Sequence, residues 1–120
     1  MSSLAYLGTP YSLYRGGIEA AFRAAARLTA RLLKTGMNVY SPIAHTHPVA
    51  VFGRLNPLDH KLWLSFDEAM MERCDSLIVA HLRGWETSQG IFYEVHHFRK
   101  AGKPIFDLDP KTLQMARRKR

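Results

Sequence analysis

The chain has 120 residues, 47% of them hydrophobic and 22% charged, which is ordinary for one compact domain. No apolar run approaches the ~20 residues that span a bilayer, and we expect no signal peptide. The formal charge of +7 would suit an anionic ligand. However, we expect the basic residues to lie on wet helix faces and in a frayed end at 117–120. A single cysteine, Cys74, excludes an intrachain disulfide and favours a cytoplasmic protein with a buried thiol.

The first half of the chain predicts two strands joined by a helix. Residues 4–7 form a short apolar run that ends at GTPYS, which indicates a buried strand and a turn. Residues 18–33 carry apolar side chains at helical spacing, with Gly36 as the stop signal, and residues 37–40 predict the second strand. Residues 45–57 show no clear period, so we expect a functional loop or a partly helical excursion there.

The second half continues the alternation. Residues 57–74 carry an apolar stripe that predicts a helix. Residues 76–82 are apolar on both faces, which predicts a third, central strand. Residues 88–100 predict a helix and residues 103–108 the fourth strand. We expect the remaining residues to form a short helix or a tail.

This order of elements predicts an α/β fold with three layers, Rossmann- or flavodoxin-like. We expect a parallel sheet of four to five strands in the order 2-1-3-4, with helices on both faces. One domain should cover residues 1–110, and residues 111–120 should form a basic tail. Ligands of such sheets bind beyond the carboxyl ends of the strands, where the chain places residues 8–12, 41–48 and 83–88.

The stretch SQGIFYEV, residues 88–95, holds the candidate chemistry. Ser88 is a good N-cap, and the free amides of a helix start suit a phosphate. Gly90 permits close approach of a ligand, and Glu94 lies one turn further on the same face. We expect the helix start to favour the ionised carboxylate that a nucleophile requires. The alternative is that Ser88 only caps the helix, Gly90 only permits packing and Glu94 is a surface acid.

Three segments in order resemble the nucleoside 2-deoxyribosyltransferase superfamily, especially its small bacterial members. They are YLGTPYS (6–12), FDEAMMERCDSLIV (66–79) and TSQGIFYEV (87–95), the last followed by GKPIF. The related branch that hydrolyses nucleoside 5′-monophosphates shares the serine-x-glycine-x-x-x-glutamate motif. The resemblance covers roughly residues 4–108, and it implies an enzyme that needs no cofactor.

The resemblance also implies catalytic roles. Glu94 would attack the anomeric carbon and displace the base, and Asp67 would contact the sugar or handle a base proton. Such paired carboxyl groups suit glycosidic chemistry because the sugar becomes cationic as the bond breaks.

The resemblance implies binding roles as well. Ser88 and Gly90 would hold a 5′-phosphate. The loop with Gly8, Tyr11 and Ser12 would line the sugar and base site, and Tyr11 would stack on the base. The transferases carry an acidic residue where this chain has Ser88, which favours a phosphorylated substrate.

His45 and His47 form a pair that could suggest a metal site, but no established zinc pattern accompanies them. We expect no metal. Instead, one of the two histidines should line the pocket and touch the phosphate or the base, although a purely structural role stays open.

Together with these patterns, the resemblance implies hydrolysis of the N-glycosidic bond of a nucleoside 5′-monophosphate or nucleoside. The alternatives are base exchange between nucleosides and a non-catalytic module that binds or senses a nucleotide. We expect a homodimer or higher homo-oligomer, because relatives borrow residues from a neighbouring subunit. We expect no membrane partner. A nucleic-acid contact through the basic tail is the least favoured alternative.

Overall fold

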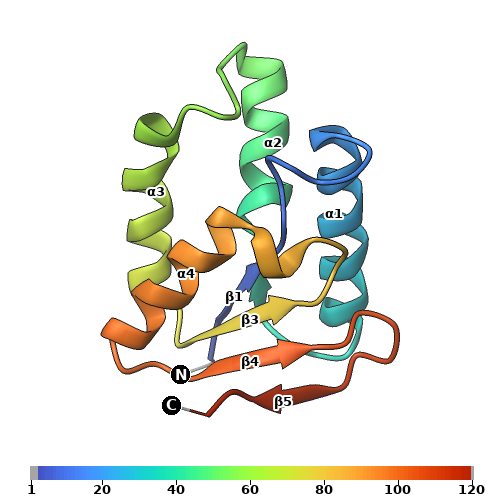
Figure 1. Cartoon of the computed structure of the whole chain (residues 1–120), viewed down its shortest axis with the longest axis vertical. Helices are drawn as coiled ribbons and strands as arrows, with labels where there is room; N and C mark the ends of the chain where they lie inside the picture. The colour runs from blue at the N-terminus through green and yellow to red at the C-terminus, as the bar shows by residue number, and fades with distance from the viewer. Residues whose placement is uncertain (1–2, 120) are drawn as a thin grey trace.

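The sheet is built around the buried strand β3 (Ser76–Ala80), which is the central one of five strands in the order β2-β1-β3-β4-β5 (Figure 1). In this computed structural model, which describes residues 3–119, β1 (Ala5–Gly8) pairs in parallel with β3 and with β2 (Val39–Tyr40). On the other side β3 pairs in parallel with β4 (Ile105–Leu108). The predicted order of the first four strands is therefore confirmed.

The fifth strand, β5 (Met115–Arg117), runs antiparallel to β4 and makes the sheet mixed. This strand corrects two predictions, a wholly parallel sheet and a tail over residues 111–120. The connection from β4 holds too few residues for a crossover helix, so the chain can only return as an antiparallel neighbour. The Arg118 guanidinium bonds both oxygens of Asp107 on β4, which fixes this end of the chain against the sheet.

The helices cover both faces of the sheet. They are α1 (Ile18–Lys34), α2 (Pro42–Gly53), α3 (His60–Arg73) and α4 (Gln89–Lys100), with a 3-10 turn, η1 (Trp85–Thr87), before α4. Leu28 and Leu32 of α1 pack on one face against Leu7 and Ile78. In Figure 1, α4 lies across the opposite face, with α3 beside it. Among residues 3–119 no helix is both long and apolar enough to cross a membrane.

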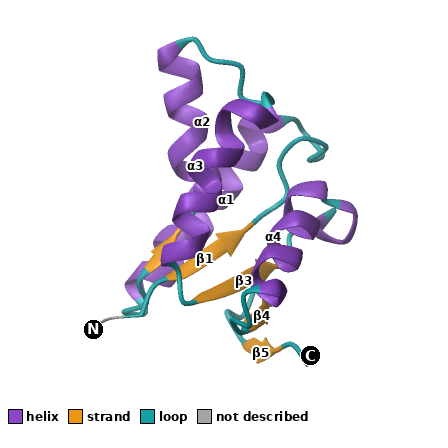
Figure 2. Ribbon diagram, turned by 90° about the vertical axis from the view of Figure 1, so that its left-hand side faces the viewer, coloured by secondary structure: helices purple, strands orange, loops and turns teal. Residues whose placement is uncertain are grey.

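Helix α2 replaces the loop or partial helix predicted for residues 45–57. It begins at Pro42, with the Ser41 side chain accepting a hydrogen bond from the Ala44 amide, and it contains Pro48. Its apolar residues lie all round the helix and give no amphipathic period, so the pattern on which the prediction relied was missing. The helix packs mainly against α1 and extends away from the sheet (Figure 2).

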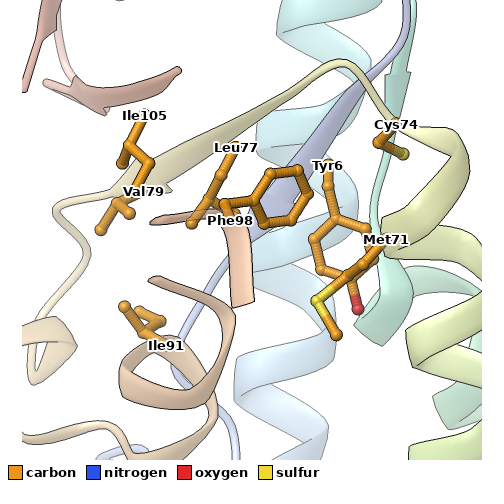
Figure 3. Close-up of a cluster of buried hydrophobic side chains, with 8 residues drawn as sticks. All are labelled: Tyr6, Met71, Cys74, Leu77, Val79, Ile91, Phe98 and Ile105. Carbon is orange, nitrogen blue, oxygen red and sulfur yellow. The ribbon is translucent and has the colours of Figure 1, made fainter. Parts of the chain in front are cut away.

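The core on the α3 and α4 face also supports the site. Figure 3 shows Tyr6 of β1 packed among Phe98, Leu77 and Met71. Tyr6 has no exposed surface, and its ring lies 5.9 Å from that of Phe98 and 5.7 Å from that of Tyr40. The side chain of Tyr6 is therefore enclosed by the core in the middle of β1.

Candidate functional site

A cleft of about 650 Å³ opens beyond the carboxyl ends of β1 and β2, between α2, α3 and α4. It lies at the edge of the sheet where the topology predicts a ligand site. Its polar lining residues are Tyr6, Thr9, Tyr11, Ser12, Thr46, His60, Asp67, Ser88, Gln89, Tyr93 and Glu94. The rest of the wall consists of Pro42, Ile43, Pro57, Leu58, Trp63, Leu64, Met71, Gly90 and Phe92.

Glu94 reaches into this cleft from α4 and touches the end of β1. Its Oε1 atom is buried and has no hydrogen-bond partner among the described residues. A Cβ atom on Gly8 would lie 2.6 Å from that oxygen, which is closer than a real contact allows. Gly8 is therefore the residue that lets the carboxyl group of Glu94 lie directly against the strand.

Other buried polar atoms gather around Glu94. The Asp67 Oδ1, Tyr6 Oη and Thr9 Oγ1 atoms all belong to cleft residues, and none has a hydrogen-bond partner among residues 3–119. The Tyr40 hydroxyl is also buried and also lacks a hydrogen-bond partner among these residues. Buried polar groups are nearly always paired in folded proteins, so this group of atoms is typical of a site for a polar ligand.

The two carboxyl groups hold their protons more strongly than exposed acids do. Burial raises the pKa of Glu94 well above its usual value, and the charge of Asp67 raises it further, while the neighbouring Tyr6 hydroxyl lowers it in part. Burial also raises the pKa of Asp67, to about 6. The prediction that the helix start keeps Glu94 ionised is therefore wrong for the free protein, because burial and Asp67 outweigh the dipole.

Replacing Asp67 with asparagine should stabilise the protein at neutral pH. The folded state raises the pKa of Asp67 from 3.8 to about 6, so the wild type loses stability as the pH rises from about 4 through 6. Asparagine does not ionise, so the variant does not lose stability over this pH range. Allowing for partial exposure of Asp67, we expect a gain of about 1–2 kcal/mol in the free energy of unfolding at pH 7.5. Denaturant titrations at pH 4 and pH 7.5 would measure it.

The matched control is Glu72→Gln, at an exposed acid of the same helix. It should shift stability equally at both pH values. If Asp67→Asn gains no more stability at pH 7.5 than at pH 4, burial does not raise the pKa of Asp67.

The start of α4 forms another part of the cleft. The Ser88 hydroxyl accepts a hydrogen bond from the Ile91 amide at 3.3 Å and so caps the helix, as predicted. Ser88, Gln89 and Gly90 all line the cleft, one turn before Glu94. A Cβ atom on Gly90 would meet only the Ser88 hydroxyl, at 3.8 Å, so nothing in the folded protein requires a glycine there. A helix start of this kind offers free amides and a partial positive charge to an anion.

Replacing Gly90 with alanine should therefore raise the stability of the protein and weaken its binding of a phosphorylated ligand. Alanine fits without a clash and improves helix propensity by up to about 1 kcal/mol, so the melting temperature should rise. If the helix start binds a phosphate, as the sequence predicts, the added methyl group would keep that phosphate away from the backbone, and the dissociation constant of the phosphorylated ligand should rise about three- to tenfold. Calorimetry with a nucleoside 5′-monophosphate and the matching nucleoside would measure this. Equal weakening of both ligands would contradict a phosphate contact at Gly90.

The histidine pair does not reach the cleft. His45 is exposed and stacks on Phe66, with ring centroids 5.5 Å apart. His47 is buried, and its ring nitrogens face the Tyr11 hydroxyl and Glu19. Neither histidine is a lining residue, so the geometry does not support direct contact of His45 or His47 with a ligand. No cluster of metal-ligating side chains occurs among residues 3–119.

The remaining predicted residues lie at the cleft, and several others were missed. Tyr11 and Ser12 line it, and Gly8 supports Glu94. Strand alternation could have found Tyr6, because it lies two residues before Gly8 and so faces the same side. Helical spacing could have found Trp63 and Leu64, which precede Asp67 by one turn and form part of the apolar wall.

The comparison with protein families matches residues 3–109 to a family described as "Domain of unknown function (DUF1937)". The matched segment contains every residue that lines the cleft. No curated protein matches the chain.

Proposed function

The chain belongs to the family described as "Domain of unknown function (DUF1937)", and from its site we propose that it hydrolyses the N-glycosidic bond of a nucleotide. The substrate class is a nucleoside 5′-monophosphate or nucleoside, and Glu94 is the nucleophile. The observation that carries this proposal is the half-buried pair of carboxyl groups of Glu94 and Asp67, each with one buried oxygen, in one cleft with the start of α4.

The properties of the carboxyl pair support this chemistry. When an N-glycosidic bond breaks, positive charge develops at the anomeric carbon, and a nearby carboxylate can trap the sugar. The leaving base must also receive a proton. Two neighbouring carboxyl groups whose pKa values are both raised can keep one proton between them, and they then supply both the proton and the charge.

The proposed reaction has two steps. Positive charge on the sugar favours the ionised form of Glu94, and the proton of the pair then lies on Asp67. The Glu94 carboxylate attacks the anomeric carbon, the bond to the base breaks with its electron pair leaving on the base, and Asp67 protonates that base. In the second step Asp67 takes a proton from water, and the oxygen of that water displaces Glu94 from the sugar. Both carboxyl groups return to their starting state.

The two ends of the substrate fit different parts of the cleft. No lysine or arginine from the described chain lines it, so a phosphate would rely on the Ser88 hydroxyl and the amides around Gly90. The base would lie against Tyr11, with Ser12 next to it. His60 is the one lining residue that can become a cation, and it stands at the start of α3.

Our proposal also covers the fold class of the chain and its oligomeric state. We assign the fold to the Rossmann- or flavodoxin-like class, with its last strand reversed. We also propose a homodimer, because large apolar side chains such as Phe52 and Phe92 are 87% and 78% exposed. Light scattering on the purified protein would give its mass in solution.

Base release tests the proposed activity. The purified protein is incubated with ribo- and deoxyribonucleoside 5′-monophosphates and with the matching nucleosides, and free base is followed by chromatography. Parallel tubes contain a second base. Release of base supports the hydrolase, and a new nucleoside in the two-base tubes would make the protein a transferase. If a nucleotide binds but no base is released, the protein is a sensing module and not a hydrolase. If no nucleotide binds and no base is released, the proposal is overturned.

A further inference from the structure

A chain of hydrogen bonds leads from the cleft to the surface of α1. The Tyr11 hydroxyl oxygen lies 2.6 Å from His47 Nδ1, and His47 Nε2 lies 2.8 Å from Glu19 Oε2. The three side chains come from the loop after β1, from α2 and from α1. Tyr11 lines the cleft, His47 is only 3% exposed, and the Glu19 side chain is 59% exposed.

When the His47 imidazole is neutral, the chemistry of these groups gives the direction of both hydrogen bonds. A carboxylate only accepts, so His47 Nε2 carries the proton and donates it to Glu19. In the neutral imidazole Nδ1 is then an acceptor, and it receives the Tyr11 O–H. Burial and the charge of Glu19 both raise the pKa of Tyr11, so its hydroxyl keeps the proton that it donates. The ring of Phe22 stacks on His47 at 4.7 Å and holds the plane of the imidazole.

We propose that Glu19 and His47 are positioning residues that hold the ring of Tyr11 as a fixed wall of the cleft. The loop that carries Tyr11 is otherwise held by local turns, in which the Tyr14 amide bonds the Tyr11 carbonyl and the Gly17 amide bonds the Tyr14 carbonyl. A ring on such a loop needs an anchor to the helices to keep one orientation.

The anchor determines what Tyr11 offers to a ligand. Since its hydroxyl proton is donated to His47, Tyr11 presents an aromatic ring and not a hydrogen-bond donor. Such a ring suits the flat face of a base. This assignment rests on the proposed function for the identity of the ligand, whereas the arrangement of Tyr11, His47 and Glu19 does not depend on it.

Kinetics of base release test the positioning role. We expect Tyr11→Phe and Glu19→Ala each to raise KM about five- to tenfold and to change kcat less than about twofold, because a stacking wall binds ground state and transition state alike. The double variant should be no worse than either single variant, since both changes break one chain of bonds. Glu19→Gln should restore KM to within about twofold of wild type, because its amide oxygen still accepts from His47.

The matched control is Arg23→Gln. Arg23 is the other partner of Glu19, at 3.4 Å, and its loss should leave KM unchanged. Effects of Tyr11→Phe and Glu19→Ala that multiply in the double variant would overturn the proposal. A wild-type KM in Glu19→Ala would also overturn it.

A measurement without substrate separates this inference from the proposed function. Nitrogen-15 NMR of the ligand-free protein should show His47 as the single Nε2–H tautomer, and Glu19→Ala should lose that preference. If His47 is the single Nε2–H tautomer but the wild type releases no base, the proposed function is wrong. The positioning role of Glu19 and His47 is then still supported. If base is released while His47 carries its proton on Nδ1 or averages between tautomers, the anchor fails and the proposed function stands.

Discussion

Replacing Glu94 with glutamine is expected to lower base release by at least about 10³-fold, with the protein still folded and able to bind a nucleotide. The amide keeps the size and shape of the carboxyl group but cannot attack the sugar. Burial and Asp67 already raise the pKa of Glu94, so an uncharged side chain costs no stability at neutral pH. Chromatography of the free base, calorimetric binding and thermal unfolding would measure the three properties.

The matched control is Glu86→Gln, which changes an exposed acid in η1, close to the start of α4. This variant should release base at the wild-type rate. If Glu94→Gln also releases base normally, the assignment of the nucleophile is wrong. If Glu94→Gln loses binding and release together, Glu94 is a ligand contact, and its role in the chemistry is not established.

Replacing Gly8 with alanine should lower kcat about 10- to 100-fold although the added group is a single methyl. A Cβ atom there would lie 2.6 Å from Glu94 Oε1, so the carboxyl group must move away. A shift of that kind would displace the proposed nucleophile from the anomeric carbon, and small displacements of reacting groups cost up to about 10²-fold in rate. Gly8 lies in β1 without a positive φ, so we expect stability to change by less than about 1 kcal/mol.

A double variant tests whether Gly8→Ala lowers kcat by displacing the carboxyl group of Glu94. In the Glu94→Gln background, Gly8→Ala should cause no further loss of base release, since no nucleophile remains to be displaced. Gly53→Ala is the control for adding a methyl group, because a Cβ atom there meets only Leu55, at 3.8 Å. A wild-type kcat in Gly8→Ala would show that Glu94 has room to move without losing function.

Much of the site follows from sequence because its parts lie close together along the chain. Ser88 caps the helix on which Gly90 and Glu94 share one face, and Gly8 ends a strand that is apolar enough to be recognised. The partners of the histidines could not be predicted in this way. His47 and Tyr11 are 36 positions apart, and nothing in either segment indicates that α2 brings them into contact.

The charge state of Glu94 shows the same limit. Local reasoning places Glu94 near a helix start, where the dipole favours the ionised form. Burial reverses this preference, and the charge of Asp67 adds to it, although Asp67 of α3 is distant from Glu94 in sequence. Burial is a property of all the packed elements together, so its effect on a pKa is known only from the fold.

The sequence by itself determined the elements whose hydrophobic period is strong, and the strand order expected for this class of fold agrees with the order of the first four strands. Only the tertiary structure decided the helix at Pro42–Gly53 and the reversed strand at Met115–Arg117. Both carry weak local patterns, and both are held by packing or pairing with another element, namely α1 and β4. Contacts between elements outweigh local propensity there, because most of the stability of a helix or strand comes from packing.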